Sequence, residues 1–594
     1  MQITKFHLLL IVQVVTLALC GGEVRASGPI TYKISIGSGD LSCYNIEMHI
    51  PGARRTVRVA MAAHPEYDDR YFRYVENFSA ESGGRRLVVT KPEDALWQIE
   101  GAGGDLTVRY RIKPAAKERE WRQSWKPFLT PTGGMVGDLH MLTYVIGDEK
   151  RAARLTLDMP AGWKAVSGLA STDDPRIFAG TVELLLDSPV LVGDVREWKF
   201  TVAGVPHTVA IWSHGDAKPA DAEPIIDGIQ KLAEQAIRAF GKPPYPRYAF
   251  LLENGGQAAL EHRTSLNVGV SRELNDTFAT VAHEYIHVWN LMDVRPRERV
   301  GLKYKFAEPT GVLWWSEGAT IFFSDLIVRR ARLLGEGRTR LQRLESLIAR
   351  YLSAPGYSTL SAETVSRGDS HPDLLGDNWA GTHLQGEILV TMLDLKIRDA
   401  TDGQRRLDDV MRLLASRFDA DRGITNSDIE KALNEICRCE MRGFFGEYIY
   451  GAKQVEFDRY LQLMGMRAEI AHVPAVDSEG RPSVDLRIGP VSPEGELKLR
   501  ITNSNGAWAR AGIRTGDKLI SANGNAITDW PGFRTWLRTL KIGDTARLVV
   551  SRDGVEKVVE VPLSPFEVPN VRLVELGNAT PKQLRMRQAW IRAN

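Results

Sequence analysis

The chain has 594 residues, of which 43% are hydrophobic and 25% are charged. This composition supplies several folded domains and excludes a disordered protein or a simple membrane bundle. Lysine and arginine number 76 against 74 aspartates and glutamates, a net charge of +2, which gives no general reason to expect nucleic acid or an anionic membrane as a partner. Evidence of function must therefore come from local motifs.

The amino-terminal segment has the layout of a secretory signal peptide. A short charged start over residues 1–5 precedes an apolar run over 8–19, and Val24-Arg25-Ala26 forms a small-residue cleavage site. We expect cleavage near Ala26, so that residues 1–26 are removed and the protein is exported to the periplasm or the medium. Lipid anchoring at Cys20 is a minor alternative, because a leucine stands where lipidation sites favour a small residue.

The mature chain would keep three cysteines, Cys43, Cys437 and Cys439. From this odd number we expect no disulfide framework and no cysteine-rich zinc module, so apolar cores should hold the domains together. The run over residues 8–19 is too short to cross a bilayer, which needs about 20 apolar residues, and no later stretch is long enough either. We therefore predict no transmembrane segment in the mature chain.

The pattern of apolar and polar residues changes after residue 203. Residues 28–203 alternate apolar and polar side chains in short runs, such as 56–60, 86–89 and 106–112, which predicts a β-rich N-terminal domain that packs against or shapes a site elsewhere. Residues 204–464 change to longer amphipathic patterns and should carry the chemistry. The clearest predicted helices cover residues 225–240, 275–291, 311–334 and 386–398.

The most specific motif is His283-Glu284-Tyr285-Ile286-His287, inside the predicted helix over residues 275–291. Positions four apart share a helix face, so both imidazoles can bind one Zn²⁺ while Glu284 faces the open side of the metal. The alternative is a pair of ordinary hydrogen-bonded histidines. A catalytic zinc needs a third protein ligand, and Glu317, in the block Trp314 to Ala319, supplies a carboxylate at the start of the next long helix.

These residues resemble a known family. The run H-E-Y-I-H-V-W-N over residues 283–290, Arg295-Pro296 and the block W-W-S-E-G-A-T are similar to the glycyl aminopeptidase family, which are gluzincin metallopeptidases with a C-terminal PDZ domain. The resemblance continues at residues 393–398 and 579–590. It implies a multidomain α+β fold: the β-rich N-terminal domain, a mainly helical thermolysin-like catalytic domain and a PDZ domain. It also implies one zinc ion per chain and hydrolysis of peptide bonds.

A second block of the family, residues 255–265, contains Glu261. In gluzincin aminopeptidases a similar segment forms a strand along the substrate, and its glutamate holds the free α-amino group of the peptide. Such a charge-assisted contact would penalise internal peptide bonds, which lack that cation; a surface turn is the alternative. Ala258 and Ala259 stand where relatives are richer in glycine, so a preference for glycine does not carry over directly.

The largest departure from the family lies at His383. Relatives have a tyrosine three residues before the glycine that corresponds to Gly386, and its phenol is the expected donor to the oxyanion. Imidazole can donate too, but its reach and pKa differ. Three outcomes are open: His383 takes this role, another group does, or the enzyme is slow.

The region over residues 467–565 resembles bacterial PDZ domains. A strand over 497–501, a short helix after Ala507 and turns at Gly516-Asp517 and Asn523-Gly524 carry the resemblance. Such a domain binds a peptide or protein terminus as an added strand, and a purely structural docking role is the alternative. Residues 566–594 would form a C-terminal tail.

Together these motifs favour an exported zinc aminopeptidase that acts on peptides, with Glu284 and His383 as catalytic residues and Glu261 as the substrate-binding residue. His283, His287 and Glu317 would be the metal ligands. The alternatives are a catalytically weak or inactive peptide-binding protein that uses the PDZ domain, and a zinc endopeptidase.

Overall fold

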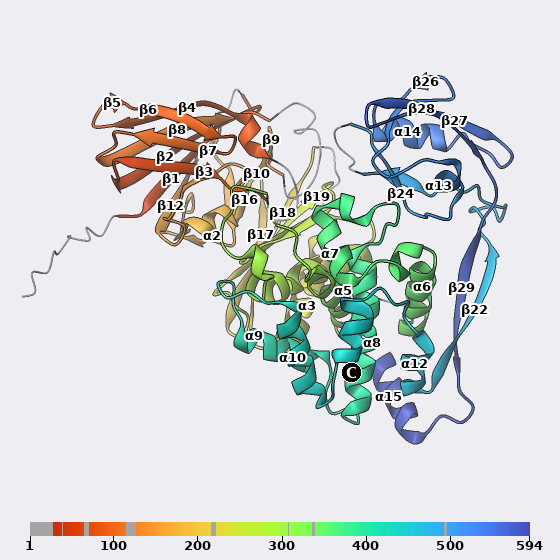
Figure 1. Cartoon of the computed structure of the whole chain (residues 1–594). Helices are drawn as coiled ribbons and strands as arrows, with labels where there is room; N and C mark the ends of the chain where they lie inside the picture. The colour runs from red at the N-terminus through yellow and green to blue at the C-terminus, as the bar shows by residue number, and fades with distance from the viewer. Residues whose placement is uncertain are drawn as a thin grey trace, which may run out of the picture.

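The computed structural model describes residues 28–37, 40–64, 70–114, 126–215, 221–306, 308–334, 339–491 and 496–593. A β-rich N-terminal part, a helical middle and a smaller C-terminal β domain follow one another in space as in sequence (Figure 1). The expected signal peptide and Cys20 lie outside the described residues. Within the described ranges no helix is both long enough and apolar enough to cross a bilayer.

The N-terminal part consists of three sheets that enclose one apolar core. The strands over Tyr44–Ala53 and Gly104–Ile112 alternate buried and more exposed side chains, as the period of two in the sequence predicts, whereas Gly133–Gly137 and Pro189–Gly193 are buried throughout. The eight-stranded sheet has the order β14 (Ala170–Ser171), β15 (Ile177–Thr181), β12 (Ala152–Asp158), β1 (Ile30–Ser35), β2 (Tyr44–Ala53), β8 (Gly104–Ile112), β4 (Val75–Ser82), β5 (Arg85–Arg86). The four-stranded sheets have the orders β13 (Lys164–Ser167), β16 (Pro189–Gly193), β10 (Gly133–Gly137), β9 (Phe128–Thr130) and β11 (Thr143–Val145), β3 (Thr56–Met61), β7 (Leu96–Glu100), β6 (Val88–Glu93). A short helix, α2 (Val182–Leu186), precedes β16.

One predicted strand is divided. The run over residues 86–89 is interrupted at Leu87, whose side chain is buried in the core and whose N–H bonds to the carbonyl of Ala80. The strands before and after it, β5 and β6, therefore belong to different sheets. The runs at 56–60 and 106–112 are strands, within β3 and β8.

A five-stranded sheet joins the N-terminal part to the helices. Its order is β17 (Arg196–Val202), β18 (Val205–Ser213), β19 (Tyr248–Asn254), β21 (Ser265–Val270), β20 (Ala259–Glu261). β18, β19 and β21 are parallel, and the helix α3 (Ala222–Phe240) forms the crossover between the first two. β20 is the antiparallel edge strand beside β21.

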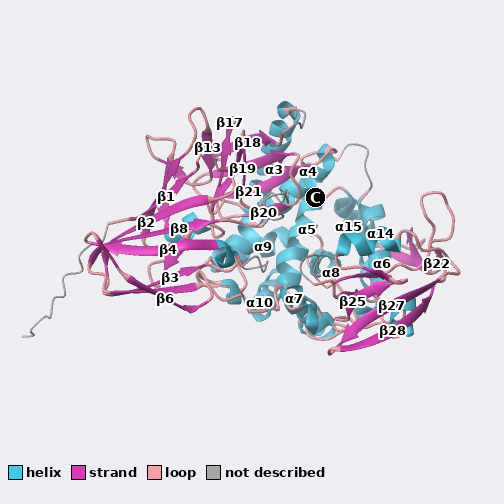
Figure 2. Cartoon of the chain, turned by 90° about the horizontal axis from the view of Figure 1, so that it is seen from above, coloured by secondary structure: helices cyan, strands magenta, loops and turns pink. Residues whose placement is uncertain are grey.

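Helices fill the middle of the molecule (Figure 2). α5 was expected to be amphipathic, yet 14 of its 18 residues are buried because it packs against α3, α4 and α8. A helix enclosed in this way needs apolar residues on every side. The helices are α4 (Leu274–Ile286), α5 (Leu313–Arg330), α6 (Arg340–Leu352), α7 (Ala362–Ser370), α8 (Thr382–Ala400), α9 (Leu407–Arg417), α10 (Asn426–Cys437), α11 (Arg442–Phe444) and α12 (Phe457–Leu461).

The helix expected over residues 275–291 is shorter than predicted. α4 ends at Ile286, and the chain continues as a wide turn over Val288–Asp293, in which Asn290 has the non-helical angles φ −115° and ψ 53°. The apolar periodicity continued past this point, so the pattern alone could not indicate the end.

The smaller C-terminal domain contains β23 (Ile488–Pro490), β24 (Leu499–Ile501), β25 (Lys518–Ala522), β26 (Asn525–Ala526), β27 (Thr545–Arg552), β28 (Val555–Pro562), α13 (Ala507–Ala511) and α14 (Trp530–Leu537). A ribbon of β22 (Met466–Pro474) and β29 (Glu567–Glu575) connects this domain to the helices (Figure 1). The segment expected as a tail forms β29 and then α15 (Pro581–Ile591), where Trp590 lies against the guanidinium of Arg340 at 3.8 Å. The chain therefore returns to the helical region after the C-terminal domain.

The cysteines differ in part from expectation. Cys437 and Cys439 form a disulfide, although the odd cysteine count argued against disulfides. The bond closes a very short loop at the end of α10, so it is a local link and not a framework that joins distant elements. Cys43 is buried and free.

Candidate metal centre

The second motif helix, α5, crosses a third helix, α8, at two glycines, and it also packs directly against α4. A Cβ atom on Gly318 of α5 would lie 2.3 Å from the carbonyl carbon of Gly386 in α8, and a Cβ on Gly386 would lie 2.2 Å from the carbonyl oxygen of Trp314. Only glycine permits such an approach of two helix backbones. As a result Glu317 and His383, each close to one of these glycines, face the same point.

The donor atoms of His283, His287 and Glu317 face one another. The two Nε2 atoms are 3.0 Å apart, and they lie 3.4 and 3.5 Å from Oε2 of Glu317. Four ligands around Zn²⁺ with bonds of about 2.0–2.1 Å would be about 3.3–3.4 Å apart, so the donor set and its spacing fit a zinc ion. Glu284 lies on the same turn of α4, and its carboxylate is within 4.8 Å of both histidine donor atoms.

The charges of this cluster depend on one another. Burial alone would raise the pKa of Glu317, but His287 and His383 hold it well below its ordinary value. Burial alone would lower the pKa of His287, but the charges of Glu317 and Glu261 hold it well above its ordinary value. The imidazoles thus supply the positive charge that the buried carboxylate needs, a role that a bound dication would also fill.

Hydrogen bonds of Asn290 connect the histidine motif to the helix that carries Glu317. Its side-chain amide donates to the carbonyls of Trp315 and Ser316, at 3.3 and 2.9 Å, and to the hydroxyl of Thr320 at 3.1 Å. That hydroxyl lies 3.4 Å from Nδ1 of His287. The bonds explain why the chain leaves the helix after Ile286, and they orient the ring of the second histidine. Asn290 belongs to the family run, but its role could not be read from the sequence.

His383 lies at the first turn of α8, with Nε2 only 3.0 Å from Oε2 of Glu317. Its side chain is 54% exposed, whereas that of Glu317 is 9% exposed, so it stands at the open side of the cluster. Burial would lower the pKa of His383, but the carboxylate of Glu317 outweighs this and raises it to about 9. Its donor atom, with those of His283 and Glu317, also forms a group that could hold a metal.

No sequence motif indicates Asp369, which lies near Glu317 and Thr382. Burial raises its pKa, and the negative charge of Glu317 adds to the effect. The hydroxyl of Thr382 donates to Asp369 at 3.1 Å, next to His383. No spacing rule connects Asp369 to the zinc motifs, so only the fold could identify it.

Glu261 ends the edge strand β20 and is 7% exposed. Its charge acts on both His287 and Tyr248, so it lies within electrostatic reach of the metal ligands. Ala258, one of the two departures from the glycine-rich pattern, has φ +61°, in the left-handed region that favours glycine. The turn before Glu261 therefore has a backbone conformation typical of glycine, although the residue there is Ala258.

Family comparisons match three parts of the chain. Residues 276–385 match the family described as M61 glycyl aminopeptidase, residues 31–194 match the peptidase M61 N-terminal domain, and residues 485–563 match a PDZ domain. No curated protein matches the sequence at a significant level.

A solved structure shares the architecture of this chain. An aminopeptidase N family protein from Idiomarina loihiensis is 20% identical with a TM-score of 0.73, and the match covers 94% of this chain and 99% of that one. An M1 zinc metallopeptidase from Deinococcus radiodurans is 13% identical with a TM-score of 0.44, covering 69% of this chain and 90% of that one.

The expected fold class is confirmed, with its β-rich N-terminal domain, helical middle and C-terminal PDZ domain. The resemblance to the glycyl aminopeptidase family is confirmed as well: the chain is a zinc metallopeptidase of the aminopeptidase type that carries the catalytic and N-terminal domains of this family.

Proposed function

We propose that this protein is an exported aminopeptidase that removes N-terminal residues from peptides, with one zinc ion per chain held by His283, His287 and Glu317. The observation that carries the proposal is the mutual spacing of 3.0–3.5 Å between these three donor atoms. We also propose the domain limits 28–203, 204–464 and 467–565, with peptides or protein termini as ligands of the PDZ domain.

Zinc, when bound, would polarise the scissile carbonyl and lower the pKa of a water molecule toward about 7. Glu284 would take the proton from the attacking water and pass it to the departing amine. Its position between the two histidines, with its carboxylate within 4.8 Å of their donor atoms, supports this role. His383 would donate to the developing oxyanion from the open side of the cluster.

Glu261 would bind the α-ammonium group of the substrate. Its burial at the end of an edge strand, and its charge within reach of the metal ligands, support this assignment. A buried carboxylate binds an ammonium group strongly, and a blocked peptide offers no such cation, so the contact would distinguish chain ends from internal bonds.

Aminoacyl p-nitroanilides with free and N-acetylated amines test the proposal. We expect turnover of the free substrates only, and Glu261→Gln should raise KM and lower kcat/KM. Equal cleavage of acetylated substrates would indicate an endopeptidase. Zinc-loaded protein without turnover, but with peptide binding, would indicate the inactive alternative. Cell fractionation, with Cys20→Ala as a control for lipidation, tests export.

A further inference from the structure

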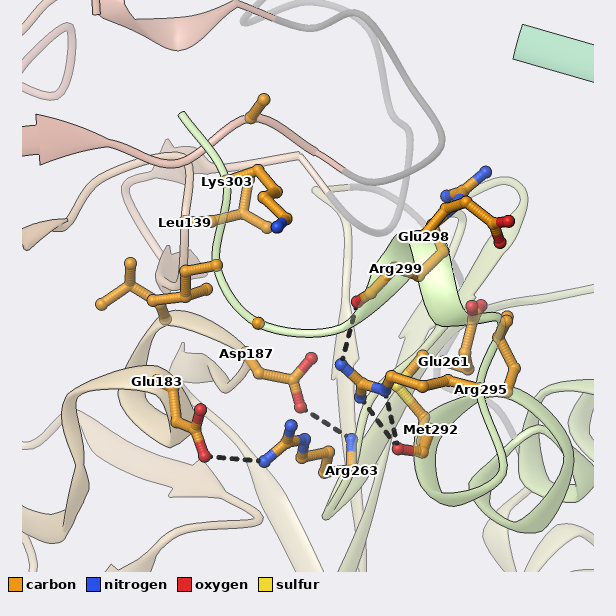
Figure 3. Close-up of a pocket in the computed structure, with 15 residues that line it drawn as sticks. Leu139, Glu183, Asp187, Glu261, Arg263, Met292, Arg295, Glu298, Arg299 and Lys303 are labelled. Atoms are coloured by element: carbon orange, nitrogen blue, oxygen red, sulfur yellow. Dashed lines mark hydrogen bonds and ion pairs between the residues drawn. The ribbon is translucent and has the colours of Figure 1, made fainter. Parts of the chain in front are cut away.

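A cavity of about 860 Å³, counted to its open mouth, lies beside Glu261 (Figure 3). Its walls come from the N-terminal domain, from the strand that ends in Glu261, and from the segment that follows the second zinc histidine. Several wall residues are apolar: Leu139, Leu186, Leu291 and Leu302. The cavity thus joins the proposed amine-binding carboxylate to a partly apolar space.

The location suggests what the cavity holds. The inference rests on the proposed function, in which Glu261 binds the substrate's α-ammonium group. In any amino acid the ammonium and the side chain leave the same carbon atom. The side chain of the N-terminal residue would therefore lie within a few ångströms of Glu261, and the cavity that Glu261 lines is the space available to it.

Arg295 lies in this wall, and its guanidinium bonds to backbone carbonyls. Its Nη2 and Nε donate to the carbonyl of Met292, at 2.8 and 3.3 Å, and its Nη1 donates to the carbonyl of Arg299 at 3.4 Å. Among the described residues no carboxylate forms an ion pair with it within 4.0 Å, although the charges of Asp187 and Glu183 act on it from farther away. These bonds use three of the five guanidinium N–H groups, which leaves two for a ligand.

The neighbouring Arg263, unlike Arg295, contacts two acidic side chains. Arg263 pairs with Glu183 at 3.1 Å, and its backbone N–H donates to Asp187 at 2.8 Å. Burial, and then the positive charge of Arg263, lower the pKa of Arg295 to about 10, so Arg295 keeps its charge at neutral pH. A desolvated cation beside a second cation would be stabilised by an incoming carboxylate, and Lys303 adds another positive charge to the wall.

We propose that the cavity selects substrates whose N-terminal residue is aspartate or glutamate, with Arg295 binding the side-chain carboxylate while Glu261 binds the amine. Glu298 also lines the cavity, and its Oε2 atom is buried without a hydrogen-bond partner in the described part of the chain. A preference for lysine or arginine would therefore assign the specificity to Glu298 and overturn the proposal.

The test compares kcat/KM for Glu, Gln, Asp, Asn, Ala and Lys p-nitroanilides. Glutamate and glutamine differ only in charge, so their ratio isolates the contribution of Arg295. We expect a Glu-to-Gln ratio of about ten to one hundred, the range of one charge-assisted contact. In Arg295→Met the ratio should fall to about one, and Arg295→Lys should recover part of it.

Arg297→Met is the matched control. Arg297 is in the same segment but outside the cavity wall, its side chain is 62% exposed, and it should keep the wild-type ratio. Because the ratio compares two substrates on one enzyme, partial loss of folded protein does not alter it. If Arg295→Met does not fold, inhibition of the wild type by free glutamate but not by glutamine still tests the proposal.

The outcomes separate the inference from the function on which it rests. Cleavage of Ala and Gln substrates with a Glu-to-Gln ratio at or below one would overturn the acidic preference and leave the aminopeptidase in place. Absence of turnover with every free-amine substrate, or equal cleavage of acetylated ones, would overturn the proposed function itself.

Discussion

Nε2 of His383 lies 3.0 Å from Oε2 of Glu317, where α5 and α8 cross at Gly318 and Gly386. His383 thus reaches the donor atoms of the candidate metal cluster directly. Two roles fit this position: a donor to the oxyanion, or an additional metal ligand. They predict different consequences for zinc binding.

If His383 is the donor, His383→Phe should keep its zinc and lose about 10²-fold in kcat, the usual effect of removing one oxyanion donor. Zinc content and steady-state kinetics measured on the same preparation check this. His472→Phe, an exposed histidine of β22, is the control and should match the wild type. Loss of zinc together with activity would instead make His383 a ligand.

Glu284→Gln should leave the fold and the zinc in place and reduce kcat by about 10²- to 10⁴-fold, because it removes the group that moves the proton. The amide is nearly isosteric with the carboxylate, so packing is preserved. Glu273→Gln, an exposed glutamate just before the same helix, should have no effect. Wild-type turnover in zinc-loaded Glu284→Gln would refute this mechanism.

Gly386→Ala should disturb the whole cluster. Its Cβ would lie 2.2 Å from the backbone oxygen of Trp314, so α5 and α8 must move apart. Overpacking of this kind typically costs about 1–3 kcal/mol in the free energy of unfolding, and displacement of Glu317 should weaken zinc binding. Urea unfolding and zinc titration measure both effects.

Gly443→Ala is the matched control for that substitution, because a Cβ at Gly443 in α11 would meet no atom within 4 Å. It should be neutral or stabilising by up to about 1 kcal/mol, as expected for glycine to alanine in a helix. If both alanine variants behave alike, the close crossing of α5 and α8 does not hold the cluster together.

Zinc should stabilise the folded protein. A ligand at about one hundred times its Kd adds about 2.7 kcal/mol to the free energy of unfolding, so chelated protein should have a lower Tm that zinc restores. Glu317→Gln should lose most of this zinc-dependent shift. A zinc-dependent shift of wild-type size in Glu317→Gln would place the metal elsewhere.

The sequence could indicate the residues of the candidate site but not the ends of the elements that hold them. The zinc chemistry fixes residue types at short spacings, so His283, Glu284 and His287 share one helix turn by geometry alone. The end of α4, by contrast, depends on the bonds of Asn290 to the carbonyls of α5, which are formed only once the chain folds.

The pairing of β22 with β29 could not be predicted either. In the sequence, β22 precedes the PDZ domain and β29 follows it. No local pattern indicates that the chain returns to the helices after this domain. Asp369 shows the same limit: its neighbours Glu317 and Thr382 come from two different helices. Contacts of this kind are properties of the packed structure and not of any sequence window.

His207 should make stability depend on pH. Its Nδ1 lies 2.9 Å from the carbonyl of Val205, and its Nε2 lies 3.0 Å from the hydroxyl of Tyr245 and 3.3 Å from that of Tyr285. A neutral ring satisfies these contacts by donating at Nδ1 and accepting at Nε2. Burial accordingly lowers the pKa of His207 to about 4.

In the unfolded chain the pKa of this histidine returns to about 6.5. As the pH falls from about 6.5 to about 4, the unfolded state takes up a proton that the folded state does not, so the free energy of unfolding decreases, by up to about 3 kcal/mol. Urea unfolding at about pH 7 and about pH 4.5 measures this decrease, and His207→Phe should reduce it by about 2–3 kcal/mol. His49→Gln, at a side chain that is 38% exposed, should leave it unchanged. If His207→Phe loses as much stability on acidification as the wild type, the acid sensitivity arises at other groups and the buried ring is not kept neutral.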